Sequence, residues 1–159
     1  MGRFASTITR AQLRPARQTG STGTALPVFG THPLSLDLDG RYEGERYLIK
    51  IDGFPVRLTG KSFKYLCRLA WSRLVKENGW LFKDDLEQGF NQARYLYRLR
   101  QEIGRDFLPG WPLYENNRSG YYRLIASPGA ITMNVATLED NPDYEIRQMA
   151  GDLRPEKAG

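Results

Sequence analysis

The sequence predicts an α+β fold with an N-terminal antiparallel sheet, three helices and a C-terminal β-hairpin. Three observations predict it. Short segments before residue 59 alternate apolar and polar residues, as half-buried strands do. Segments between residues 59 and 104 repeat apolar residues at helical spacing. Two β-type segments flank a polar turn at 117–120. A length of 159 residues suits one such domain with terminal extensions.

The predicted sheet is formed by three segments. Residues 34–39 alternate leucines with polar residues, which predicts a strand with one buried face. Residues 47–51 (YLIKI) and 54–58 (FPVRL) predict a hairpin, because Asp52-Gly53 between them is a strong two-residue turn signal.

The first helix is expected to follow Thr59 and to end at Asn78-Gly79. Thr59 is placed to cap it, with the hydroxyl accepting an early backbone N–H. One face of this helix is apolar and should enter the core: Phe63, Leu66, Cys67, Ala70 and Leu74. Cys67 is therefore interpreted as a small core residue rather than a reactive thiol.

A second helix is predicted at 84–89, a tight turn at 89–91 and a third helix at 92–104. Leu96, Leu99 and Ile103 should face the core. The opposite, outward face of the third helix collects Arg94, Tyr97, Arg98, Gln101 and Arg105. Arginine can bridge two atoms of guanine, glutamine can bridge two atoms of adenine, and either can bind phosphate. The alternative interpretation is an ordinary solvated helix face.

Residues 113–116 and 121–125 predict a hairpin with Arg118 near its tip and Tyr122 turned inward. A basic hairpin beside a DNA-reading helix can lie along the minor groove. Further along, residues 130–136 are compatible with a strand and residues 143–153 with a short helix that packs on the domain or binds a partner.

Charge is unevenly distributed along the chain, whose net charge is +5. Residues 1–36 carry four arginines and no acid, residues 37–124 carry sixteen basic and twelve acidic residues, and residues 125–159 carry three basic and six acidic residues. We therefore expect a disordered basic arm at 1–33, a basic domain at 34–125 and a partly ordered acidic tail at 126–159. The first two segments suit a polyanionic partner, although charge alone fits a basic protein without one equally well.

Four stretches carry a resemblance in the same order along the chain: VRLTGKSFKYLCRLA, WLFKDDLEQGF, ARYLYRLRQEIG and NRSGYYRL. Together they resemble the DNA-binding domain of OmpR/PhoB-type transcriptional regulators, a winged helix-turn-helix. The resemblance implies that the third helix enters the major groove and that the C-terminal hairpin is the wing. It places Arg94, Tyr95 and Arg98 at positions that contact DNA, and Arg118 at the wing arginine.

The chain departs from this family in three ways. Residues 1–33 are too few for the receiver domain that usually precedes the DNA-binding domain, so control through a receiver is not expected. The loop between the second and third helices, which can touch RNA polymerase in the family, is much shorter here. Glu102 stands where the family often has a basic residue and is expected to weaken the positive face of the third helix.

The leading hypothesis is therefore a double-stranded DNA-binding protein, a transcriptional regulator in the cytoplasm and associated with the nucleoid. Base contacts are expected mainly from Arg94, Arg98 and Gln101, with Tyr95 and Tyr97 beside them. Phosphate contacts are expected from Arg105, Arg118, Lys61 or Lys64, and the basic arm. The alternative is a winged-helix module for protein contacts, such as an adaptor on RNA polymerase or another complex that uses the acidic tail. A homodimer is a further candidate assembly.

No enzyme, cofactor, metal site or membrane segment is expected. Cys67 and His32 are the only cysteine and histidine, so a zinc site would need several carboxylates at a spacing that the sequence does not show. The adjacent Asp84 and Asp85 point about 100° apart on a helix and suit its first turn better than acid–base catalysis.

Overall fold

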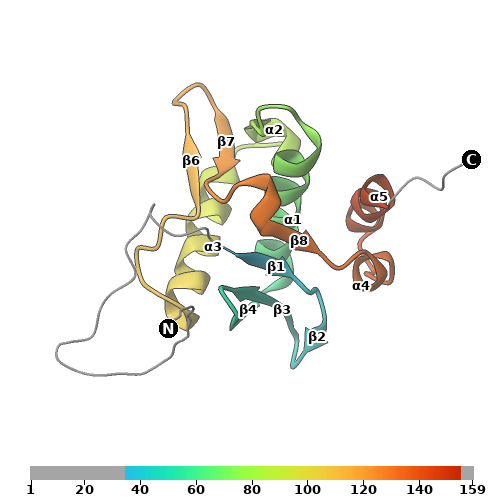
Figure 1. Ribbon diagram of the computed structural model, residues 1–159. Coiled ribbons are helices and arrows are strands. Elements are labelled where there is room, and N and C mark those ends of the chain that lie inside the picture. Colours follow the sequence, from blue (N-terminus) through green and yellow to red (C-terminus); the bar gives the residue numbers. More distant parts are fainter. Residues whose placement is uncertain (1–34, 155–159) are drawn as a thin grey trace, which may run out of the picture. The chain divides into compact units, whose positions relative to one another are not determined.

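Two sheets and five α-helices make up the described part of the chain, residues 35–154 of the computed structural model (Figure 1). These residues belong to one unit, which spans 33–159. The predicted α+β class is confirmed. The predicted basic arm at 1–33 lies outside the described residues.

The larger sheet has five strands: β1 (Leu36–Leu38), β2 (Tyr42–Glu43), β3 (Arg46–Ile51), β4 (Phe54–Leu58) and β8 (Ile131–Met133). The predicted β3–β4 hairpin is present, with Ile49 opposite Val56. Its turn residues Asp52 and Gly53 have φ of 51° and 88°. Two successive positive φ values are what a tight hairpin needs to follow the strand twist.

One strand of this sheet comes from the C-terminal segment. β8 pairs with β1 in parallel, with Leu36 opposite Ile131 and Leu38 opposite Met133. The four N-terminal strands pair antiparallel, as predicted, but the sheet also contains this parallel strand, which was not expected in it. Parallel neighbours need a long connection, and here the segment from residue 39 to 130 provides it. Because the two strands are short and far apart in the sequence, the sequence around each strand does not show that they pair.

α1 (Gly60–Val75) carries the predicted apolar face into the core, where Phe63, Leu66, Cys67 and Ala70 are fully buried. Leu74, at the end of this face, is partly buried and packs against the same core. The interpretation of Cys67 as a core residue is confirmed, and its burial raises the pKa of the thiol well above the usual value.

A glutamate of α3 (Gln92–Asp106) holds the start of α1, in place of the predicted Thr59 cap. Thr59 occupies the capping position, but its hydroxyl accepts no backbone N–H. Instead, the Thr59 N–H and hydroxyl each donate to the Glu102 carboxylate at 2.9 Å, and the Ser62 hydroxyl donates to it at 3.0 Å. Glu102 is only 5% exposed. Because it faces inward, the expectation that it weakens the outer face of α3 is wrong.

The middle of the chain forms β5 (Leu81–Phe82), α2 (Lys83–Leu86), α3 (Gln92–Asp106), β6 (Tyr114–Asn116) and β7 (Tyr121–Leu124). β5, β7 and β6 form the smaller sheet, with Leu81 opposite the half-buried Tyr122. Arg100 of α3 lies over the ring of Tyr114 at 5.4 Å, which ties the hairpin to that helix. α2 ends at Leu86, earlier than predicted, because Glu87 adopts an extended backbone with φ −169°.

The C-terminal segment continues into the core. After the single turn η1 (Pro128–Ala130), it forms β8, α4 (Val135–Glu139) and α5 (Tyr144–Leu153). The buried apolar side chains of these two helices belong to the same core as α1: Leu138, Ile146, Met149 and Ala150. The helix expected at 143–153 is confirmed, whereas α4 was not expected. The core therefore does not stop at residue 125, the boundary drawn from the sequence.

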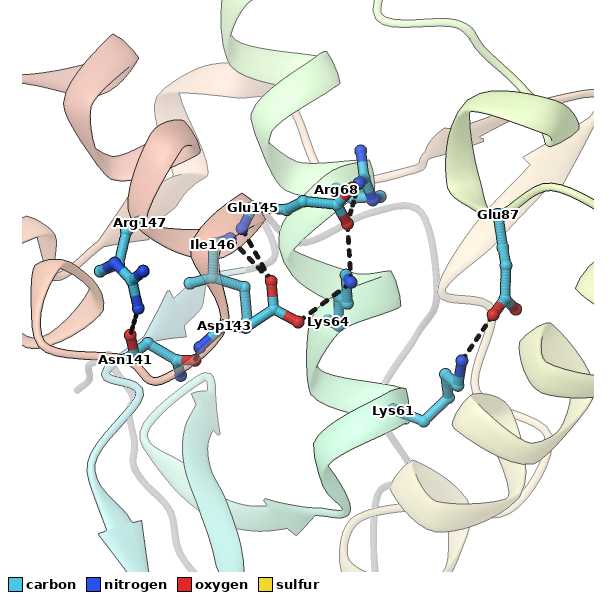
Figure 2. A network of polar contacts seen from close by, with 9 residues as sticks. All are labelled: Lys61, Lys64, Arg68, Glu87, Asn141, Asp143, Glu145, Ile146 and Arg147. Atoms are coloured by element: carbon cyan, nitrogen blue, oxygen red, sulfur yellow. Dashed lines mark hydrogen bonds and ion pairs between the residues drawn. The ribbon is translucent and has the colours of Figure 1, made fainter.

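α5 is also fixed to α1 by charge (Figure 2). The Asp143 side chain caps α5 by accepting the N–H groups of Glu145 and Ile146. The ammonium of Lys64 on α1 lies 3.0 Å from Asp143 and 2.6 Å from Glu145, and the Arg68 guanidinium lies 2.5 Å from Glu145. Opposite charges thus reinforce an apolar contact between two segments far apart in sequence.

Candidate nucleic-acid interface

The predicted outward face of α3 is present. Leu96, Leu99 and Ile103 are buried. All five residues of the opposite face are exposed: Arg94, Tyr97, Arg98, Gln101 and Arg105. Arg94 and Arg98 take part in no ion pair within residues 35–154. Their guanidinium groups therefore have donors to offer to another molecule.

Tyr95 organises the N-terminal half of this face. Its ring is half-buried against Tyr65 of α1, with 5.7 Å between ring centroids. Three cations surround it, with Lys61 at 4.9 Å, Arg98 at 5.5 Å and Arg94 at 5.8 Å from the ring centroid. Cations are attracted to the face of an aromatic ring. Tyr95 therefore positions its charged neighbours and presents only part of its own surface.

Lys61 belongs to this cluster but is already paired (Figure 2). Its ammonium lies 2.6 Å from one Glu87 oxygen. The Tyr65 hydroxyl donates to the other Glu87 oxygen at 2.7 Å. The bonds from Lys61 and Tyr65 lower the pKa of Glu87. Burial, followed by the bond to Glu87, raises the pKa of Tyr65. Lys61 thus reaches the predicted surface with its charge largely compensated.

The turn before α3 presents an apolar residue that the sequence interpretation missed. Phe90 is 97% exposed. The buried Gln92 side chain clamps this turn by donating to the carbonyl oxygens of Glu87 and Gly89. Gly89 has a φ of 110°, which side-chain-bearing residues avoid. The sequence did place Phe90 in a turn next to a glycine, and this was the signal that could have marked it. The hydrogen bonds from Gln92 that shape this turn could not be read from the sequence.

The hairpin carries Arg118 at its tip, as predicted. Arg118 is exposed, has a φ of 67°, and makes no ion pair within the described residues. The Asn116 and Asn117 side chains hold the turn by accepting backbone N–H groups, including that of Arg118 at 3.1 Å. Arg123, by contrast, pairs with Glu115 at 2.9 Å and lies 4.3 Å from the Trp80 ring centroid. Arg118 is thus the more available arginine of the hairpin.

Two predicted phosphate contacts lie away from this cluster. Lys64 is engaged by Asp143 and Glu145 of the C-terminal segment. Arg105 is near the other end of α3, eleven residues from Arg94, which corresponds to about 16 Å along the helix axis. It lies 3.4 Å from Asp106 and beside Arg57 of β4. The structure therefore brings together Lys61, Arg94, Tyr95 and Arg98, but not Lys64 or Arg105.

Comparison with models of protein families, with curated proteins and with solved structures gave no match to this chain. The resemblance to the OmpR/PhoB-type domain thus stays a prediction. Within residues 35–154, no group of three His, Cys, Asp or Glu side chains is placed to hold a metal ion. No helix of the same residues is long and apolar enough to cross a membrane.

Proposed function

We propose that this protein binds double-stranded DNA by placing the exposed face of α3 in the major groove, and that it acts as a transcriptional regulator of the winged-helix type. The observation that carries the proposal is the availability of Arg94 and Arg98. Both are exposed on one helix face and neither is neutralised by a carboxylate of the described residues. An α-helix fits the major groove, where arginine can bridge the O6 and N7 of guanine.

The other parts of the surface support this arrangement. Gln101 and Tyr97 lie on the same face and are joined by a 3.2 Å hydrogen bond from the Gln101 amide to the Tyr97 hydroxyl. Gln101 keeps its amide oxygen for an adenine N6 amino group. Arg118, at the tip of the hairpin, is available for the DNA backbone or minor groove. In this proposal the protein works on DNA in the cytoplasm, at the nucleoid.

The test is selection of bound sequences from a random double-stranded DNA pool, followed by titration of the selected duplex at two salt concentrations. We expect an enriched site and an affinity that falls steeply with salt, each phosphate contact adding about 0.9 to the slope of log affinity against log salt. A direct or inverted repeat in the site would report a homodimer. No enrichment, or an affinity independent of salt, would contradict the proposal.

Protein docking is the second candidate function, and the exposed Phe90 favours it. Aromatic side chains, phenylalanine among them, are enriched in protein–protein interfaces relative to the rest of the surface. The partner would be RNA polymerase or another protein of the same complex. A stoichiometric complex with a purified polymerase that forms without DNA and is lost in Phe90→Ala would support this function. The same protein would then give no enriched site in the DNA selection.

A further inference from the structure

An open hollow lies where the C-terminal end of α3 meets the larger sheet. Its lining is Arg46 of β3, Pro55 and Arg57 of β4, and Arg105 and Asp106 of α3, and its volume is about 550 Å³. We call it the arginine pocket. Small-molecule sites in proteins have volumes of about 300–1,000 Å³. Three guanidinium groups against one lining carboxylate give the pocket an excess of positive charge.

Arg46 is the pocket residue whose charge has no partner within the described part of the protein. One of its guanidinium nitrogens, Nη1, is buried and has no hydrogen-bond partner. Arg46 also makes no ion pair within residues 35–154. A buried donor without an acceptor is costly, especially on a charged group. Arg46 thus brings to the pocket a guanidinium charge that no carboxylate of the described residues neutralises, and this charge favours an anionic ligand.

The other two arginines are only partly engaged. Arg57 uses Nη2 for Glu43 at 3.1 Å, and its backbone N–H donates to Asp106 at 3.0 Å. Arg105 uses Nε for the other Asp106 oxygen at 3.4 Å. Both oxygens of Asp106 are thus occupied by neighbours other than Arg46. The negative end of the helix dipole explains why a cation such as Arg105 is favoured here, but it does not explain Arg46.

We propose that the arginine pocket binds a phosphate group. Guanidinium forks match the oxygens of phosphate in geometry and stay charged at any physiological pH. The pocket is larger than phosphate itself, so the ligand would be a phosphorylated molecule recognised by that group. The phosphate could instead belong to the DNA backbone. The pocket is about 16 Å along α3 from Arg94, so this inference does not depend on the proposed major-groove contacts.

The test is calorimetric titration of the full chain, without DNA and at low ionic strength, with inorganic phosphate and with pyrophosphate. We expect saturable binding above a chloride control. Arg46→Gln should weaken it by about tenfold or more, since a hydrogen bond to a charged group is worth over 1.4 kcal/mol. Arg94→Gln removes the same charge from the other end of α3 and should bind phosphate as the unaltered chain does.

Asp106→Asn is the second variant, and it keeps an oxygen for the Arg57 N–H while removing the negative charge. We expect it to bind phosphate more tightly, and it decides the matter if Arg46→Gln does not fold. No binding above chloride, undiminished binding by folded Arg46→Gln, or unchanged binding by Asp106→Asn would each overturn the proposal.

DNA titrations with the same variants distinguish the two sources of the phosphate. If the DNA backbone supplies it, Arg46→Gln lowers the salt slope of duplex binding by about one. If a phosphorylated small molecule supplies it, Arg46→Gln leaves duplex binding unchanged while losing pyrophosphate. Loss of DNA binding in Arg94→Gln with phosphate binding retained would show that the pocket and the major-groove surface are separate sites.

Discussion

Helices α1 and α3 both carry outward cations, and they differ in what surrounds those cations. On α1, Lys61 is paired with Glu87, and Lys64 and Arg68 are paired with carboxylates of the C-terminal segment. On α3, Arg94 and Arg98 border only the ring of Tyr95. The sequence shows similar basic helices at both places. Tertiary pairing, rather than local charge, decides which of them is available to a polyanion.

The largest expected effect concerns the apolar packing that holds α5 against α1 and so keeps its carboxylates beside the cations of α1. Ile146 is 3% exposed in the common core. Ile146→Ala should lower the free energy of unfolding by about 2–5 kcal/mol, because it removes buried surface and leaves a cavity. Urea denaturation measures this value. Gln148→Ala, at an exposed position of the same helix, is the matched control and should stay close to the unaltered chain. Equal stabilities of the two variants would mean that α5 is not part of the folding unit.

The second prediction compares the two helices directly. Arg98→Ala should cost about 1–3 kcal/mol of affinity for the selected DNA site and relax its sequence preference if Arg98 contacts a base. Lys64→Ala removes one positive charge as well, but that charge is held by Asp143 and Glu145, so affinity should change little. Fluorescence anisotropy with the selected and a scrambled duplex measures both. Equal losses of DNA affinity in both variants would mean that the cations of α1 and α3 are equally available to DNA.

The third prediction concerns Phe90, which lies in the turn before α3, four residues before Arg94. If α3 enters the major groove, we expect the exposed ring of Phe90 to contact a thymine methyl group. Replacing the relevant thymine by uracil should cost about 0.8 kcal/mol, the value of one buried methyl-sized group. The loss should be absent in Phe90→Ala. A uracil effect that persists in Phe90→Ala would assign the methyl contact to another residue.

The elements were predictable where periodicity was strong, as in the face of α3 that buries Leu96 and Leu99 and exposes Arg94 and Arg98. The pairing of those elements was not. β8 is a three-residue strand, and nothing local marks β1 as its parallel partner. Glu102 looked like an outward charge because its three donors come from residues about forty positions earlier. The arginine pocket likewise joins three segments, so no stretch of sequence contains its pattern.

The smallest expected effect tests the charge pairing of α1 with α5 itself. Hydrogen bonds from Lys64 and Arg68 lower the pKa of Glu145. A carboxyl group with a lowered pKa adds stability above its unfolded pKa of about 4.3, and this stability is lost as pH falls through the lower folded value. Because the Glu145 side chain is 48% exposed, the contribution should stay below about 1 kcal/mol.

Glu145→Gln should therefore be less stable than the unaltered chain at pH 7, and the two should converge near pH 3. Urea denaturation at both pH values measures the difference. Glu77 is exposed and makes no ion pair within residues 35–154, so Glu77→Gln is the control. It should show no such convergence with the unaltered chain between pH 7 and pH 3. A difference that persists at pH 3 would assign the role of Glu145 to its position in the first turn of α5 rather than to its charge. In that case α5 would pack over the cations of α1 without neutralising their charge. Added salt would then leave the stability difference between Glu145→Gln and the unaltered chain unchanged.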